Sequence, residues 1–444
     1  MSQSEQETLT EGAAPKTSAA ADEAPPTDTM TREAQVPKRN VLAILIMVFG
    51  NTFAALLPGL VAMPIIIARI DPADKATVLG TALGVMAFLG MLLAPVFGVI
   101  SDRTTSRFGR RRPGLLIGAA TTVVGLAVLG VADSLALVYL AGVILAVGTS
   151  MSNASNAALI PDCIPGHARG RVFGVATLLG VVAGLIASII GPRLIDHQFA
   201  LAVGGVPVLL LTTAVGLVLY RDRVLDPQDV PRQPVLRTLL DGYHVNPRTA
   251  PDYSWVWLSR FLLTFGISFG SSFAIYFLTD QLQIGKAELP RVIALTSVLG
   301  MAGTTLGTLV GLVLADKVRS RKNMVLASGL LMAAGGVVVA FSRTVPVFTA
   351  GSTLLYFAVG VFIPTDGVLC MAVLPSDGRN VSKYMSIFSI ADQLPRSVGP
   401  MVAPAVISLG AGMPIGGYPL LYLAAGIVAI LGGLLVRRVR GGLS

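Results

Sequence analysis

The segment GVISDRTTSRFGRRRP, residues 98–113, places one acid and five arginines between two long runs without a charged residue. The run before it covers residues 77–100, and the run after it covers residues 114–132. Each run can cross the apolar core of a bilayer, which requires roughly 20 apolar residues. The segment therefore indicates a polar loop between two transmembrane helices.

The composition of the whole chain agrees with a membrane location. Of its 444 residues, 53% are hydrophobic and 13% are charged, and the mean hydropathy is +0.75. Soluble domains carry about 25% charged residues. The formal net charge of +9 could by itself indicate a nucleic-acid partner. We expect no such partner, because the basic residues gather in the loops between apolar runs.

Twelve apolar runs follow one another along the chain. Helices are expected for all of them, since a helix satisfies its own backbone hydrogen bonds in lipid. The fold class expected is therefore all-α integral membrane, with twelve transmembrane helices. The expected spans are 41–68, 77–100, 114–132, 135–160, 173–192, 200–220, 255–279, 290–314, 324–342, 346–374, 384–409 and 418–436.

The distribution of basic residues predicts the orientation of the chain. Most of the 33 Lys and Arg residues lie in every second loop and in the two tails. Because such segments stay on the cytoplasmic side, we expect a multi-pass protein of the cell (inner or plasma) membrane with both termini inside. Residues 1–37 are rich in Ala, Thr, Ser, Glu and Pro, which predicts a disordered cytoplasmic tail. We expect residues 437–444 to form a second cytoplasmic tail.

A repeat divides the chain into two halves. A shift of 214 positions carries Asp102 onto Asp316, Arg103 onto Lys317 and Arg107 onto Arg321. The same shift carries the start of the first span onto the start of the seventh. We therefore expect two parallel six-helix repeats, an N-terminal bundle at 38–220 and a C-terminal bundle at 255–436, joined by a cytoplasmic loop at 221–254.

The twelve spans, the central loop and the two acid-plus-basic motifs resemble the major facilitator superfamily. SDRTTSRFGRRRP and, after the fourth span, ALIPDCIPGHARGRVFG are similar to the glycoside and sucrose cation symporter branch. The resemblance covers nearly the whole chain from about residue 41. It implies two bundles that expose a central site alternately to each side of the membrane, with helices one, four, seven and ten lining the cavity.

Asp102 is expected to stabilise the state in which the bundles meet at the cytoplasmic side. It can accept hydrogen bonds from a facing helix N-terminus or pair with arginines. For Arg110, Arg111 and Arg112 a purely topological role is the alternative. The second copy of the motif is imperfect, because Leu312 occupies the position that corresponds to Gly98 in the first copy. The expected cytoplasmic gate comprises Gly98, Asp102, Arg103, Arg107, Gly109, Arg110, Asp316, Lys317 and Arg321.

Only two acids fall inside the expected spans, and ionisable groups there mark function. Asp392 and Arg396 are four residues apart, so we expect a buried ion pair. A paired acid stays ionised, whereas an unpaired one in an apolar wall can bind a proton. We therefore expect Asp366 to be the proton-coupling residue. Arg260 is expected to extend to the lipid headgroups, with binding of an anionic substrate as the minority alternative.

Polar side chains at helical spacing predict the walls of the substrate cavity. The polar side chains of the fourth span share one helix face. We expect this face to point away from lipid, because polar groups directed at lipid would find no hydrogen-bond partners. Hydrogen bonding between packed helices is the alternative for the asparagines. The expected cavity residues are Asn51, Thr149, Ser152, Asn153, Asn156, Ser272, Tyr276 and Tyr356.

These patterns predict a secondary active transporter and not an enzyme, since no HExxH motif, nucleotide-binding loop or nucleophile–base arrangement is present. Proton-coupled uptake of a sugar or glycoside-like solute is favoured. The alternative is proton-driven efflux of an amphipathic compound or drug, and a non-transporting receptor is a third class. The resemblance implies that a sodium-coupled member of the glycoside branch would carry acids in helices two and four. Here the second span has no acid and the fourth has asparagines and serines, which disfavours a sodium site. The expected partners are a small-molecule substrate, the proton and the bilayer. We expect a monomer, with no cofactor and no metal.

Overall fold

The computed structural model describes residues 38–220, 222, 251–317, 321–373 and 381–439. Within these residues every regular element is a helix. The expected tails, 1–37 and 437–444, and the expected central loop, 221–254, lie wholly or mostly outside the described residues. Helix α10 already begins at Pro251, before the expected end of that loop.

The N-terminal group of helices matches the first six expected spans. The first span continues through a π-helical turn that begins at Pro58, because proline has no N–H group to continue the regular α-helical pattern. The elements are α1 (Lys38–Leu57), η2 (Pro58–Ala62), α2 (Met63–Ile70), α3 (Lys75–Asp102), α4 (Arg112–Gly130), α5 (Leu135–Cys163), α6 (Gly166–Ile190), η3 (Gly191–Leu194), α7 (Gln198–Val203) and α8 (Val206–Leu219).

The C-terminal group matches the other six expected spans. Its first span is bent by 45° between α10 and the following helical turns. The elements are α10 (Pro251–Ser272), α11 (Ala274–Tyr276), η5 (Phe277–Gln281), α12 (Leu289–Lys317), α13 (Arg321–Ala340), α14 (Val345–Val373), α15 (Val381–Ala411), α16 (Gly417–Leu435) and η6 (Val436–Arg438).

Ten helices of the described chain are long and apolar enough to cross a membrane, and the bent pair makes an eleventh. The remaining expected span, 384–409, is the eleventh along the chain and corresponds to α15, which contains Pro395, Pro400 and Pro404. Prolines are tolerated within a membrane helix where neighbouring helices cover the freed backbone groups. The part of the chain that the structure describes is thus all-α, and α15 adds a helix at the one expected span outside these eleven.

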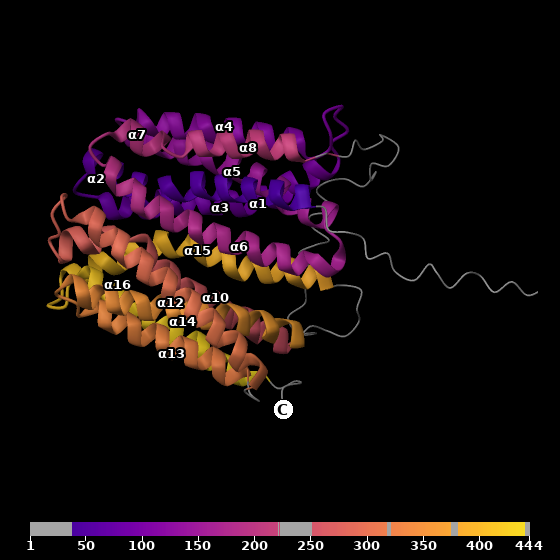
Figure 1. Ribbon diagram of the computed structural model, residues 1–444. Coiled ribbons are helices and arrows are strands. Elements are labelled where there is room, and N and C mark those ends of the chain that lie inside the picture. Colours follow the sequence, from indigo (N-terminus) through magenta and orange to yellow (C-terminus); the bar gives the residue numbers. More distant parts are fainter. Residues whose placement is uncertain (1–37, 221, 223–250, 318–320, 374–380, 440–444) are drawn as a thin grey trace, which may run out of the picture. The chain divides into compact units, whose positions relative to one another are not determined.

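The two groups of helices meet along two pairs, α3 with α15 and α6 with α12 (Figure 1). Small residues allow the α3–α15 contact to be close. A Cβ atom added at Gly80 would lie 2.1 Å from the carbonyl oxygen of Pro400, and one at Gly84 would lie 2.8 Å from that of Ser397. These glycines lie in the first third of α3, so this contact lies near one end of the spans.

Close packing also joins α4 to α5. A Cβ atom added at Gly118 would lie 2.4 Å from Ser152 Oγ and 2.7 Å from its backbone nitrogen. Small residues let membrane helices approach, and van der Waals contact then stabilises the pair. Ser152 is consequently 3% exposed and packs against α4.

Gly118→Ala is expected to destabilise the protein by about 1–3 kcal/mol, because the added methyl group overpacks the α4–α5 contact. Thermal unfolding in detergent measures the loss as a lower midpoint temperature. Gly174→Ala in α6 is the matched control, since nothing lies within 4 Å of a Cβ atom there. Equal midpoints for the two variants would contradict the packing described for Gly118.

Candidate functional site

Four charged side chains form a chain of ion pairs within the C-terminal group of helices. Arg260 of α10 donates through Nη1 to Asp366 Oδ2 of α14. Its Nη2 lies 3.5 Å from Asp392 Oδ1 of α15. Arg396, one turn further along α15, donates to Asp392 through Nε at 3.1 Å and Nη2 at 3.3 Å. Arg260 therefore links three helices.

The two acids and two arginines sum to zero charge, which is how a membrane interior accommodates ionised groups. The side chain of Asp366 is 0% exposed and that of Arg260 is 19% exposed. The guanidinium of Arg260 also lies 4.4 Å from the ring centroid of Phe388, a cation–π contact. Asp366 Oδ1 and Arg260 Nε are buried without a hydrogen-bond partner in the described structure.

Three expectations about this cluster require correction. Arg260 does not extend to headgroups, because Asp366 and Asp392 both lie within its reach. Asp366 is not alone in an apolar wall, because it pairs with Arg260. Both acids therefore have an arginine partner, and the presence of a partner does not distinguish Asp366 from Asp392. The pair of Asp392 and Arg396 forms, but it is not buried, since these side chains are 30% and 56% exposed.

The cluster has no counterpart in the N-terminal half. The 214-residue shift carries Arg260 back to Ile46, Asp392 to Leu178 and Arg396 to Val182. The charged site is therefore a property of one half of the repeat.

The polar residues expected on one face of α5 point in different directions. Asn51 of α1 donates to Asn153 Oδ1 at 2.7 Å. Thr149 donates to the carbonyl oxygen of Leu145, and Asn156 is 5% exposed with its Oδ1 unpartnered in the described chain. Ser152 faces α4, so the expectation that it faces a cavity is wrong. At Asn51 and Asn153 the structure has the helix-to-helix hydrogen bond that was the alternative.

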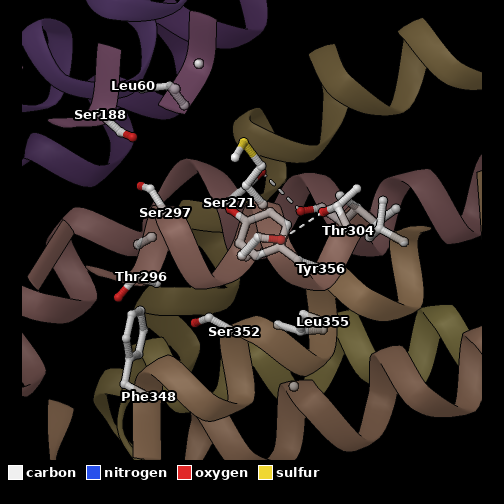
Figure 2. Close-up of a pocket in the computed structure, with 18 of the residues that line it drawn as sticks. Leu60, Ser188, Ser271, Thr296, Ser297, Thr304, Phe348, Ser352, Leu355 and Tyr356 are labelled. Carbon is white, nitrogen blue, oxygen red and sulfur yellow. Dashed lines mark hydrogen bonds between the residues drawn. The ribbon is translucent and has the colours of Figure 1, made fainter. Parts of the chain in front are cut away.

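A cavity of about 290 Å³ lies among α10, α12, α13, α14 and α16, and residues of α6, η2, α11 and η5 complete its wall. Most lining side chains are aliphatic, and none of the described lining residues is charged. Figure 2 shows Tyr356 and Ser352 of α14, Ser271 of α10, and Ser188 of α6 across from Ser297 of α12. Of the expected cavity residues, Tyr356 is the one in this lining.

Tyr276 and Ser272 are not in the lining of this cavity. Tyr276 is 2% exposed, and its hydroxyl donates to the carbonyl oxygen of Pro64 in α2 at 2.9 Å. It therefore joins the two halves, which corrects its expected role as a cavity residue. Ser272 donates to the carbonyl oxygen of Ser268 in its own helix.

An ion pair accompanies that contact and also joins the halves. Lys75 Nζ, at the start of α3, lies 2.7 Å from Asp280 Oδ1 in η5. Tyr418 of α16 donates to the other oxygen of Asp280 at 2.8 Å. The ammonium of Lys75 lies 5.0 Å from the ring centroid of Tyr276. We call Lys75, Asp280, Tyr276 and Tyr418 the inter-half lock.

A second network occupies the opposite end of α3. Asp102 Oδ1 lies 2.6 Å from Arg110 and 2.7 Å from Arg111, and Arg111 Nε donates to Asp162 at 2.8 Å. Arg111 is 3% exposed. Of the two partners expected for Asp102, a helix N-terminus or arginines, the structure has the arginines. Both of these ion pairs lie within the N-terminal half.

Arg111 is the centre of this network, and no sequence pattern indicated its role. Arg111 was one of three adjacent arginines, and only its burial distinguishes it. Burial lowers the pKa of Arg111, but the hydrogen bonds and charges of Asp162 and Asp102 together outweigh burial and raise this pKa above its ordinary value. Arg111 therefore stays charged. Asp222 is a second missed residue, because it accepts from the backbone N–H groups of Arg111 and Arg112, at 2.6 and 2.9 Å, at the start of α4.

The remaining gate residues have diverse surroundings. Gly109 has a φ of +111°, and a Cβ atom there would lie 2.3 Å from Asp222 Oδ2, so glycine is required. Arg107 lies over the ring of Phe108. A Cβ atom at Gly98 would meet open space. Arg103 follows the end of α3, and Arg321 begins α13. The side chains of Asp316 and Lys317 lie outside the described residues.

These features define a polytopic helical membrane protein with an ion-paired interior. The sequence model of the Major Facilitator Superfamily matches residues 41–304 and, in a second match, residues 256–442. The chain belongs to the major facilitator superfamily.

Two curated relatives match parts of the chain. The human "Proton-associated sugar transporter A" is 33% identical over 165 residues, which cover 33% of this chain and 22% of the relative. The "Multidrug resistance protein MdtH" of Shigella flexneri is 27% identical over 139 residues, covering 31% of this chain and 33% of the relative. The chain thus spans between a fifth and a third of these relatives.

Solved structures show the same fold at low identity. The nucleoside transporter NupG has a TM-score of 0.71 at 12% identity, covering 90% of this chain and 99% of the other. A bacterial homologue of the human lysosomal transporter Spinster, in an inward-facing and occupied conformation, has a TM-score of 0.68 at 17% identity, covering 90% and 96%.

Asp280→Asn is expected to weaken closure at the inter-half lock, because Lys75 loses its charge partner. A partly exposed pair is worth up to about 1 kcal/mol, so the population with separated halves should rise up to about fivefold. Spin labels on cysteines at Ala73 and Ala411, with Cys163 and Cys370 replaced by serine, report the distance. The exchanged pair Lys75→Asp with Asp280→Lys should restore the original distribution, and an unchanged distribution in Asp280→Asn would refute the lock.

Proposed function

We propose that this protein is a secondary active transporter that works by alternating access and couples uptake of a sugar or glycoside-like solute to protons. The observation that carries the proposal is the ion-paired cluster of Arg260, Asp366 and Asp392 inside the membrane-spanning helices. Charges in such a place are costly and mark transport pathways. The "Proton-associated sugar transporter A" relative supports the same solute and ion.

In this proposal Asp366 carries the proton. Its Oδ2 faces Arg260, and its buried Oδ1 has no partner among the described residues. Protonation would remove the charge that holds Arg260 on α14 and leave Asp392 as the counter-ion. Because Asp392 lies on α15, which contacts α3 of the other half, this exchange would couple proton binding to contacts between the halves. Arg396 continues to donate to Asp392 in this scheme.

We infer a cytoplasmic location for the Asp102 network and for both termini, in the cell membrane, from the distribution of basic residues. In this orientation the inter-half lock would lie on the outer side, and the halves joined there would correspond to an inward-facing state. The bundles at 38–220 and 255–436 are the moving parts. Gly98, Asp102, Arg103, Arg107, Gly109 and Arg110, with Asp316, Lys317 and Arg321 of the second copy, would form the cytoplasmic gate when the bundles close.

Efflux of an amphipathic compound is the second candidate. The aliphatic lining of the cavity, which includes Met301 and Met332, favours it, because flexible methionines accommodate varied apolar ligands. The "Multidrug resistance protein MdtH" relative is consistent with this candidate. The cavity volume lies at the lower end of the roughly 300–1,000 Å³ of ligand pockets, which favours a small solute over a drug-sized one.

Asp366→Asn is expected to abolish accumulation of D-glucose, D-galactose or methyl β-D-glucopyranoside against a gradient in proteoliposomes with an imposed pH difference. A fall of at least about tenfold is expected, the size of a lost interaction of about 1.4 kcal/mol. Exchange of solute without a gradient should survive, because it requires no net proton movement.

The matched control is Asp133→Asn, which removes an exposed acid from the loop between α4 and α5. It should accumulate solute as the unmodified protein does. Full accumulation by Asp366→Asn would refute the proton role. Export of ethidium, with none of the three sugars taken up by the unmodified protein, would favour the efflux candidate.

A further inference from the structure

We infer that the cavity lined mainly by the C-terminal half binds one pyranose ring of a neutral, monosaccharide-sized solute, with Tyr356 as the aromatic surface against which the ring stacks and Ser297 and Ser352 as hydrogen-bond partners. The inference rests on the proposed sugar transport and adds to it the position, size class and contacts of the solute.

Helical spacing places these side chains in the lining of the same cavity. Ser352 and Tyr356 are four residues apart on α14, as are Ser297 and Met301 on α12, so each pair shares a helix face. All four residues line the cavity, and Figure 2 shows Ser297, Ser352 and Tyr356 around it. The tyrosine is 40% exposed.

The hydroxyl groups of the lining divide into two kinds. Ser271 donates to the carbonyl oxygen of Ile267 and Thr304 donates to that of Gly300, as the dashed lines of Figure 2 mark. Ser297, Ser352 and Tyr356 have no hydrogen bond in the part of the chain that the structure describes, so their O–H groups can donate to a solute. Every hydroxyl can also accept. The lining therefore suits a polyol, which both donates and accepts.

The absence of charge in the described lining restricts the solute further. An anion or cation bound among aliphatic side chains would lose its hydration without gaining a counter-charge, which is strongly unfavourable. Neutral solutes avoid this cost. The cavity is thus selective for uncharged, hydroxylated molecules with an apolar face.

Tyr356 is available for stacking where other aromatic residues are not. Phe273 and Tyr276 are 0% and 2% exposed. The ring of Tyr356 lies against Gly300, where an added Cβ atom would be 2.6 Å from its Cδ2. Gly300 therefore leaves room for the ring, and any larger residue there would displace it. The C–H face of a pyranose can pack on such a ring as other apolar groups do.

Size and position complete the assignment. A volume of about 290 Å³ accommodates one sugar ring and is small for two. The lining residues Val359 and Ile267 lie seven positions from Asp366 and Arg260 on α14 and α10, about 10 Å along each helix. Substitutions at Tyr356 consequently leave the charged cluster in place.

The test is equilibrium binding to the purified full-length protein in nanodiscs, by titration calorimetry, with D-glucose, D-galactose, D-mannose, sucrose and uridine as probes. At least one hexose should bind, and sucrose and uridine should bind at least about tenfold more weakly. Tyr356→Ala and Gly300→Ala should each weaken hexose binding roughly tenfold, about the effect of one aromatic contact. Ser352→Ala should weaken it several-fold.

Phe341→Ala is the matched control, because it removes an exposed aromatic ring that does not line the cavity. The midpoint temperature of each variant shows that it is folded. No binding of any hexose, or unchanged hexose binding in both Tyr356→Ala and Gly300→Ala, would overturn the inference. Hexose binding without proton-driven uptake would refute the proposed coupling and leave this site standing. Proton-driven sugar uptake that is unchanged in Tyr356→Ala would support the proposed coupling and refute this site.

Discussion

A charge inside a bilayer must find an opposite charge within reach, because lipid offers no hydration. Arg260 meets this constraint by contacting Asp366 on α14 and Asp392 on α15. Three helices of the C-terminal half are thereby tied at one point. Since α15 also packs on α3 of the other half, any change in the ion pairs of Arg260 acts on a helix that borders both halves.

The ends of the α3 helix show the same constraint in two forms. At its start, Lys75 pairs with Asp280 across the boundary between the halves. At its end, Asp102 pairs with arginines of its own half, and Arg111 is buried between Asp102 and Asp162. One end is therefore connected across the halves, while the recorded ion pairs of the other end are internal to one of them.

The cavity and the charged cluster are separate on the same two helices. Tyr356 and Asp366 lie on α14, and Ser271 and Arg260 lie on α10, with the hydroxylated cavity nearer the inter-half lock. A solute that contacts these helices can influence the ion pairs without touching a charge. In the proposed transport cycle, neutral cargo and ion coupling would thus be combined in one bundle.

The sequence alone determined the twelve helices, because each apolar run must satisfy its own backbone in lipid, and the repeat and its motifs identified the superfamily. It also singled out Asp366, Asp392, Arg396 and Tyr356, since ionisable and aromatic residues stand out against aliphatic spans. The partners of those residues were decided by tertiary structure. Arg260 and Asp366 are 106 positions apart, and Arg111 differs from its neighbours only in its burial. No local pattern reports such contacts, because they depend on how helices distant in sequence rotate and pack against one another.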